Sequence, residues 1–345
     1  MAQLQPRHAL RRPPRLLPGD RVAVVAPSGP VDQERLAIGT DLLRSWGLDV
    51  VPGSHLRDTH PELRYLAGTD ADRAADFERA WLDPDIAAVI CARGGYGVQR
   101  MTELVDWDAL RAAPPKALVG FSDATALHEA VAQRLGVATL YGPMATTTSF
   151  IADAGTAGHL RRTLFDPADT TVLTAPTATP LVPGAAHGIT AGGCASVLAA
   201  DRGTPTARPS FAGALLLLED TNEHPYQLDR ILTQLLRSGA LDGVAGIVLG
   251  SWNGCGRLER VRELMLDRLA PLGVPILWEL GFGHGPSTLT VPLGIPARLD
   301  ATAGTLTLDL PALSDGTHAE QTHADRSAAD GTRPTGTRSA ESAAS

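Results

Sequence analysis

Apolar residues in the first half of the chain form two patterns, short continuous runs and segments with helical spacing. The continuous runs predict buried strands, at residues 21–29, 48–53, 86–97, 116–121 and 137–144. Apolar residues that recur every three or four positions predict helices, at residues 33–47, 71–85 and 124–136. Strands that alternate with helices are typical of a mostly parallel α/β sheet, which we expect over residues 19–148.

The composition changes after Met144. Residues 149–184 are rich in Thr, Ala and Pro, and we interpret them as a partly helical connection between two domains. In the part that follows, residues 211–252 predict strand, loop, helix and strand, and residues 281–310 predict short strands. The expected fold is therefore α/β, with an N-terminal domain on a mostly parallel sheet and a smaller, β-rich α/β domain at residues 185–311.

The two ends of the chain differ from the rest. We expect residues 1–18 to form a flexible arm, and the proline, glycine and charged residues at its end interrupt the apolar run that an export signal needs. Residues 312–345 have almost no large apolar side chains, so burial cannot offset the entropy of ordering them and a disordered tail is expected. No apolar run of about eighteen residues occurs, so we predict no membrane span and a cytoplasmic location.

Composition and charge exclude several kinds of partner and cofactor. A formal net charge of -8 over 345 residues, with only 4% aromatic residues, argues against nucleic acid and anionic membrane as partners. Cys91, Cys194 and Cys255 are an odd number and lie far apart, which is no disulfide framework. The metal-binding motifs C-x-x-C and H-E-x-x-H and the nucleotide-binding motif G-x-x-x-x-G-K-[ST] are missing from the sequence, so no cofactor is predicted.

The stretch VGFSDAT is the first candidate for chemistry. Only Ser122 and Asp123 separate a buried strand from the next helix, so Ser122 is expected on a sharp turn at the carboxyl end of the sheet. The backbone N–H of Asp123 would then lie at a helix N-terminus, where it can stabilise an oxyanion. The motif is not G-x-S-x-G, and the alternative is that Ser122 or Asp123 only caps the helix.

A glycine loop, CARGGYG, also follows a predicted strand. Gly94 and Gly95 allow the backbone to approach a ligand closely and leave N–H groups free to bind it. The loop could supply a second oxyanion donor, or could bind a carboxylate with the help of Arg93. The alternative is an ordinary tight turn.

Two further residues could complete a catalytic group with Ser122. Glu219 directly follows four leucines, so we expect a buried carboxylate that needs a hydrogen-bonded partner. His284 stands among glycines in GFGHG, and the pKa of a histidine suits a general base, although a lone histidine is more often structural. Together the three would supply a nucleophile, an orienting acid and a base.

These motifs also carry a resemblance to a known family. From RVAVVAPSGPV to GTLTLDL, the chain resembles the LD-carboxypeptidase family of serine peptidases, which includes murein tetrapeptide carboxypeptidases and microcin C immunity peptidases. The similar motifs occur in the same order, as ARGGYG, GFSDATALH, YGPM, AGGCASVLAADRGTP, LLEDTNEHPYQLDRILTQL and GFGHGPSTLTVPLG. Phe121 stands where a tyrosine is frequent in the family.

The resemblance implies a Ser-Glu-His triad in which Ser122 is the nucleophile, Glu219 the acid and His284 the base. It also implies an active site between the two domains, a homodimer, and as substrate a small peptide with a D-amino acid at its carboxyl terminus. The main hypothesis is therefore removal of the terminal D-alanine from muropeptide tetrapeptides in peptidoglycan recycling.

Two other functions stay open at this point. One is hydrolysis of peptidyl or aminoacyl sulfamoyl-adenylates for microcin immunity, for which Trp252 is a candidate to stack on adenine, although it could equally belong to the core. The other is a two-domain binding protein that has no catalytic activity.

Overall fold

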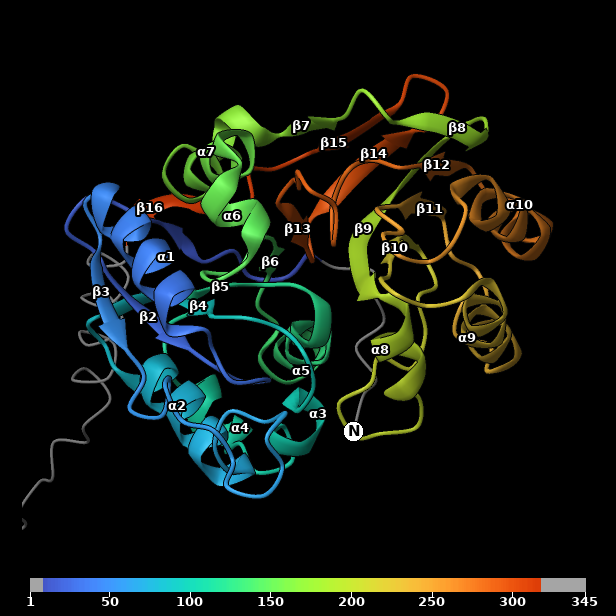
Figure 1. Ribbon diagram of the computed structural model, residues 1–345. Helices are drawn as coiled ribbons and strands as arrows, with labels where there is room; N and C mark the ends of the chain where they lie inside the picture. Colours follow the sequence, from blue (N-terminus) through green and yellow to red (C-terminus); the bar gives the residue numbers. More distant parts are fainter. Residues whose placement is uncertain (1–8, 318–345) are drawn as a thin grey trace, which may run out of the picture.

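The computed structural model describes residues 9–317, which form two α/β domains side by side, each a β-sheet with helices packed on it (Figure 1). The N-terminal sheet has the strand order β13-β6-β5-β4-β2-β3. Its strands are β2 (Arg21–Val25), β3 (Asp49–Pro52), β4 (Ile86–Cys91), β5 (Ala117–Gly120), β6 (Thr139–Tyr141) and β13 (Val291–Leu293). All neighbours pair in parallel except β13, which is antiparallel to β6.

Helices cover both faces of this sheet. They are α1 (Gln33–Ser45), α2 (Asp70–Leu82), α3 (Val98–Met101), α4 (Trp107–Arg111), α5 (Thr125–Leu135), α6 (Thr148–Ala152) and α7 (Ala154–Phe165). Apolar residues of α1, α6 and α7 pack on one face, and those of α2 to α5 pack on the other. Every residue of the central strand β4 is buried as a result, which explains its continuous apolar sequence.

The C-terminal sheet has the order β7-β15-β14-β9-β10-β11-β12-β8, with a parallel centre from β9 to β12. Its strands are β7 (Val172–Thr174), β8 (Thr179–Val182), β9 (Ala185–Cys194), β10 (Ala214–Glu219), β11 (Gly246–Leu249), β12 (Ile276–Trp278), β14 (Pro296–Asp300) and β15 (Thr305–Leu308). The outer face packs against α8 (Ala195–Ala200), α9 (Pro225–Arg237) and α10 (Leu258–Leu269). The expected α/β class with mostly parallel strands is confirmed.

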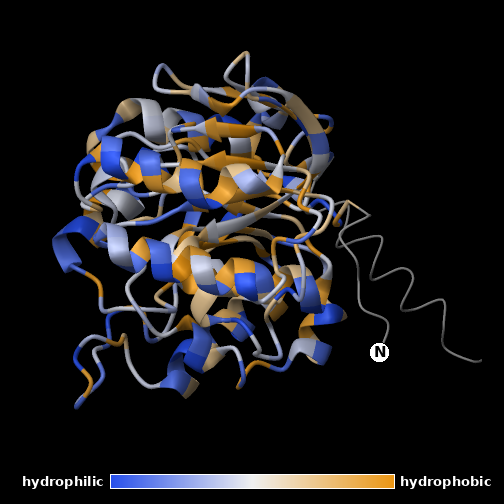
Figure 2. Ribbon diagram, turned by 90° about the vertical axis from the view of Figure 1, so that its right-hand side faces the viewer, coloured by the Kyte–Doolittle hydropathy of each residue, from blue (hydrophilic) through white to orange (hydrophobic). Residues whose placement is uncertain are grey.

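One hydrophobic core joins the two sheets. It includes Leu127 and Val131 of α5 together with Leu215 and Leu217 of β10, so the inner face of the C-terminal sheet packs toward the N-terminal domain. Apolar positions accordingly concentrate on the strands and the inward sides of the helices (Figure 2). The three cysteines are buried and free, and within residues 9–317 no helix is both long and apolar enough to cross a membrane.

The boundaries differ from the sequence-based ones at several points. The described part of the predicted arm is not flexible, because β1 (Pro14–Arg15) pairs in parallel with β16 (Ser314–Thr317) and Leu16 is fully buried. The start of the predicted tail is likewise ordered in β16. Residues 1–8 and 318–345, which hold the remainder of both predictions, lie outside the described residues.

The predicted connection at residues 149–184 belongs to both domains. Helices α6 and α7 pack on the N-terminal sheet, whereas β7 and β8 form the two edges of the C-terminal sheet. Strand β13 makes the opposite crossing, since it comes from the C-terminal half of the chain and completes the N-terminal sheet. These exchanges depend on long-range strand pairing, which local apolar patterns do not encode.

Candidate active site

Ser122 lies on the predicted sharp turn between β5 and α5. Its φ angle is +63°, a left-handed conformation that is rare for a side chain other than glycine and is often found at functional sites. The short helix η1 (Ser122–Ala124) then leads into α5. Below the turn, the ring of buried His128 lies with Nε2 at 2.9 Å from the Gly120 carbonyl, which holds the end of β5 against α5.

The helix-cap alternative for Ser122 and Asp123 does not match the structure. Neither side chain forms a capping hydrogen bond at the start of η1 or α5. The Asp123 carboxylate is buried and accepts a hydrogen bond from the Val98 N–H at 3.0 Å, so it ties the turn to the start of α3. Burial raises the pKa of Asp123, while its hydrogen bonds and Arg73 oppose this increase.

Glu219 and the half-buried His284 form an acid–base pair beside this turn. Glu219 ends β10 and is fully buried. Its Oε2 lies 2.7 Å from His284 Nδ1 and accepts the His284 backbone N–H at 3.2 Å. Because Nδ1 faces the carboxylate, Nε2 is the ring nitrogen that remains for chemistry.

The electrostatics of the pair suit a base with raised affinity for protons. Burial alone would lower the pKa of His284, but the charge and hydrogen bond of Glu219, with the charge of Asp220 behind it, raise this pKa above its ordinary value of 6.5. Phe121 packs edge-on against the imidazole, with ring centroids 4.8 Å apart. The ring is thus held in one orientation by Glu219 on one side and by Phe121 on another.

Gly283 explains why glycines flank His284. Its φ is +94°, and a Cβ at this position would overlap with the Glu219 carboxylate. The glycine therefore lets the His284 backbone reach Glu219 closely enough for the hydrogen bond to its N–H. Gly283 therefore meets a packing requirement at this position.

The glycine loop contacts Ser122 directly. A Cβ on Gly94 would lie 2.8 Å from both Cβ and Oγ of Ser122, so only glycine fits this approach. The Gly94 carbonyl accepts hydrogen bonds from the Gly29 N–H at 3.3 Å and from Arg93 Nε at 3.0 Å. Arg93 Nη1 also donates to the Pro30 carbonyl at 3.0 Å, so two of its nitrogens hold the loop in place.

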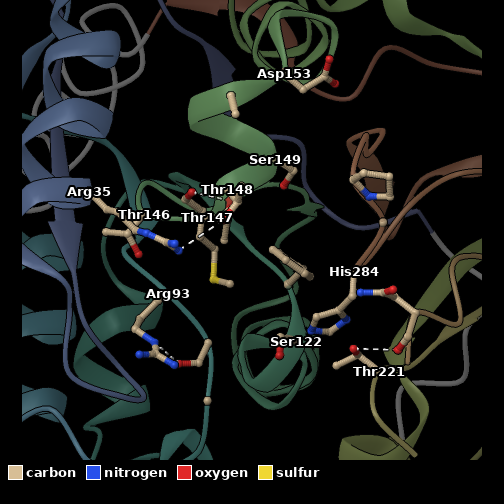
Figure 3. A pocket seen from close by; sticks show the side chains of 18 of the residues that line it. Arg35, Arg93, Ser122, Thr146, Thr147, Thr148, Ser149, Asp153, Thr221 and His284 are labelled. Carbon is tan, nitrogen blue, oxygen red and sulfur yellow. Dashed lines mark hydrogen bonds between the residues drawn. The ribbon is translucent and has the colours of Figure 1, made fainter. Parts of the chain in front are cut away.

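A cavity of about 930 Å³ between the two domains contains these groups. Ser122 and His284 lie next to each other on its wall, across from Arg35 and Arg93 (Figure 3). The hydroxyl of Ser122 and the ring of His284, both among the described residues, are not hydrogen-bonded to each other. Such bonds are often long in substrate-free enzymes and tighten when substrate binds.

Two residues of the site escaped the sequence analysis. Tyr141 is fully buried; its hydroxyl donates to Glu219 Oε1 at 2.6 Å and accepts the Ser122 N–H at 3.2 Å. Arg35 reaches the cavity from α1 and donates to Thr148 Oγ1 at 3.2 Å. The motif YGPM contains Tyr141, so the sequence held a signal for this residue. No feature of the sequence indicated that Arg35, in a segment with helical spacing, would lie at the site, because this depends on the contact between α1 and α6.

Of the two roles left open for Trp252, the structure supports the core and not stacking on a base. Its side chain is 3% exposed and stacks on Trp278 at 6.5 Å between ring centroids. It belongs to the core between the C-terminal sheet and its helices and does not line the cavity. The apolar environment of residues 247–249 continues to Trp252, which explains its burial.

Tyr141→Phe provides a test of the hydrogen bonds around the acid. We expect roughly 10-fold lower kcat/KM, because the variant loses a donor to a buried carboxylate and leaves the Ser122 N–H without its acceptor. With one donor fewer, Glu219 attracts protons more strongly and the pKa of His284 rises. The acid limb of the pH profile should therefore move to higher pH, which a purely structural defect would not cause.

The matched control for this variant is Tyr226→Phe, at a tyrosine that is 62% exposed. It should match the wild-type rate and pH profile. An unshifted acid limb in Tyr141→Phe would contradict the positioning role of Tyr141.

The fold is that of a two-domain α/β protein, and the candidate site places a serine beside an acid–histidine pair between the two domains. The family model described as the LD-carboxypeptidase N-terminal domain matches residues 22–142, and the LD-carboxypeptidase C-terminal domain matches residues 187–299. The chain belongs to the LD-carboxypeptidase family. The family predicted from the sequence motifs is therefore confirmed.

Several known proteins are similar to this chain over most of its length. A Streptomyces coelicolor protein, whose name gives a carboxypeptidase class and no substrate, is 62% identical over 304 residues, or 88% of this chain and 98% of that protein. The murein tetrapeptide carboxypeptidase of Pseudomonas aeruginosa is 33% identical over 290 residues, 81% and 93% of the two chains. The solved muramoyltetrapeptide carboxypeptidase of Oxalobacter formigenes is 28% identical with a TM-score of 0.71, and the match covers 84% of this chain and 99% of that one.

Proposed function

We propose that the protein is a serine LD-carboxypeptidase that removes the terminal D-alanine from murein tetrapeptides. The observation that carries this proposal is the hydrogen-bonded pair of buried Glu219 and half-buried His284 beside the strained Ser122, on the wall of a cavity large enough for a peptide. The names of the Pseudomonas aeruginosa and Oxalobacter formigenes relatives support the substrate class. As the family resemblance implies, we also propose a homodimer that works in the cytoplasm.

In the proposed mechanism, Ser122 Oγ attacks the carbonyl carbon of the bond before D-alanine. His284 Nε2 accepts the hydroxyl proton, and Glu219 stabilises the imidazolium that forms. When the tetrahedral intermediate collapses, Nε2 gives this proton to the leaving amine of D-alanine. Water then attacks the acyl-enzyme with the same base and releases the shortened peptide.

Backbone N–H groups are proposed to stabilise the oxyanion. Asp123 would contribute through its backbone, since its side chain is engaged with Val98. The second donor would be Gly94 or Gly95; the Gly94 carbonyl is held by Gly29 and Arg93, which turns the N–H of the same peptide unit, that of Gly95, in the opposite direction. For the substrate carboxylate, we propose Arg93 through its remaining nitrogen Nη2, with Arg35 as the second guanidinium of the cavity.

The experiment that tests the function is incubation of the protein with a murein tetrapeptide and detection of the products by mass spectrometry. We expect loss of one D-alanine and no cleavage at other bonds. An aminoacyl sulfamoyl-adenylate is the second substrate, because the Escherichia coli microcin C7 self-immunity protein is 25% identical over 316 residues. Cleavage of this compound but not of the tetrapeptide would contradict the proposal.

A further inference from the structure

The peptide unit between Gly97 and Val98 ends the glycine loop, and two buried charged side chains hold it. The Gly97 carbonyl accepts a hydrogen bond from Arg73 Nη1 at 2.7 Å, and the Val98 N–H donates to Asp123 Oδ2 at 3.0 Å. The C=O and N–H of a planar trans peptide point in opposite directions, so Arg73 and Asp123 hold this unit from two sides. The proposed mechanism uses neither charge, since Asp123 contributes to it only through its backbone.

Arg73 comes from α2, and its side chain is only 1% exposed. Besides the Gly97 carbonyl, Nη1 donates to the Pro27 carbonyl at 2.5 Å, and Nη2 pairs with Asp70. Two nitrogens of Arg100 hold Asp70 in turn, at 2.7 to 3.0 Å. A buried charge is costly unless it is paired and hydrogen-bonded. All these contacts depend on the rigid fork of the guanidinium, which a lysine would not reproduce.

Gly97 is required for this arrangement. Its φ is +135°, and a Cβ at this position would lie 2.5 Å from Arg73 Nη1. Only glycine therefore lets the guanidinium come close enough to bind the carbonyl of the same residue. The loop and Arg73 fit each other as Gly283 and Glu219 do on the other side of the site.

The beginning of the glycine loop is fixed as well. The Gly94 carbonyl accepts the Gly29 N–H at 3.3 Å, and the Pro27 carbonyl, two residues before Gly29, is held by Arg73. Arg73 thus ties the segment after β2 and the end of the glycine loop to one guanidinium. Because Gly94 lies against Ser122, a shift of the loop would move its N–H groups relative to the Ser122 hydroxyl.

We infer that Arg73 and Asp123 are positioning residues that place the N–H groups of the glycine loop for the oxyanion. This inference rests on the proposed function and adds to it how the proposed oxyanion donors are held. Neither residue lines the cavity that contains Ser122, so neither is expected to contact the peptide. The oxyanion forms only after Ser122 attacks, and poor placement of its donors should therefore lower kcat and leave KM unchanged.

Asp123→Asn and Arg73→Lys test the inference, because both keep a polar side chain of similar size. Each should lower kcat by about 10-fold, less than the complete loss of an oxyanion donor costs. KM should stay within about twofold of the wild-type value. The measurement is D-alanine release from the murein tetrapeptide at several substrate concentrations, with a thermal scan of each variant.

The double variant shows whether the two residues act on the same peptide unit. If they do, Arg73→Lys with Asp123→Asn should lower kcat by little more than either single change. Two independent effects would instead multiply to about 100-fold. Multiplied losses, or losses that appear in KM and not in kcat, would overturn the inference. If the thermal scan shows that Arg73→Lys does not fold, Asp70→Asn replaces it in the cycle, because Asp70 holds the other terminal nitrogen of the guanidinium.

The matched controls are exposed members of ion pairs on neighbouring helices. Arg79→Lys changes a residue of α2 that is 53% exposed and pairs with Asp76. Asp108→Asn changes a residue of α4 that is 88% exposed and pairs with Arg111. Both controls should keep the wild-type kcat and KM. A control that loses as much activity as Asp123→Asn would show that the loss is not specific to the loop, and would also contradict the inference.

The rate of labelling by a fluorophosphonate gives a readout that does not depend on a peptide. Attack of Ser122 on this probe places negative charge on a phosphoryl oxygen, which the same N–H groups would stabilise. Asp123→Asn should therefore be labelled about 10-fold more slowly than the wild type, and an equal rate would overturn the inference. If the wild type is labelled but releases no D-alanine, the proposed substrate is wrong and the labelling rates decide the inference alone. If the wild type does neither, the proposed function and the inference both fail.

Discussion

Ser122→Ala is expected to lower the rate of D-alanine release on the order of 10³-fold or more while the protein remains folded. The alanine removes the atom that would attack the carbonyl, and enzymes with a Ser-His-acid triad lose activity of this order without their nucleophile. Because Ser122 Oγ makes no capping hydrogen bond, the variant should unfold at a similar temperature. Single-turnover assays with mass detection would measure the rate, and a thermal scan would measure the stability.

Ser45→Ala, at an exposed serine of α1, is the matched control and should keep the wild-type rate. A fluorophosphonate probe adds a test of chemistry that is independent of the substrate. It should label Ser122 in the folded wild type and leave the variant unlabelled. Wild-type turnover by Ser122→Ala would refute the mechanism, and a folded wild type that resists the probe would favour a binding protein without catalysis.

Glu219→Gln should lower kcat on the order of 10³-fold, the second large effect. The substitution keeps the size of the side chain but removes the charge that would stabilise the imidazolium in the transition state. It also removes the main cause of the raised pKa of His284, and burial then lowers that pKa. Full activity of the variant would exclude Glu219 as the acid.

The pH dependence of kcat/KM should also change in a definite direction in this variant. The base must be neutral to accept a proton, so wild-type kcat/KM should fall as the pH drops through a value above 6.5. In Glu219→Gln the acid limb should move to lower pH. Glu223→Gln, four residues away and outside the cavity, serves as the control and should leave the acid limb in place.

The sequence predicted the elements that are local and the residues that adjoin them. Strands β2, β4, β5 and β10 are buried on both faces or nearly so, and continuous apolar runs of this kind are recognisable without a structure. Ser122, Glu219 and Gly94 were found because each follows such a strand, where the carboxyl ends of parallel strands place sites.

The residues that the sequence did not reveal have roles that depend on pairing between strands far apart in the chain. Tyr141 resembles a core aromatic in the sequence, and its role follows only when β6 lies beside β5 and across from β10. For Trp252 the sequence left two roles open, because an aromatic residue after a strand fits a ligand-stacking site and a core equally well.

Strand β13 has a consequence for the synthesis of the chain. Val291 pairs directly with Tyr141, so the edge of β6 that carries this tyrosine has no neighbour while a nascent chain is still shorter than 291 residues. Domains generally fold in order from the N-terminus during translation, and an unpaired strand edge invites association with other chains. In this protein the N-terminal sheet closes only after the segment with His284 has been made. Hydrolytic activity should therefore begin only after β13 has been synthesised.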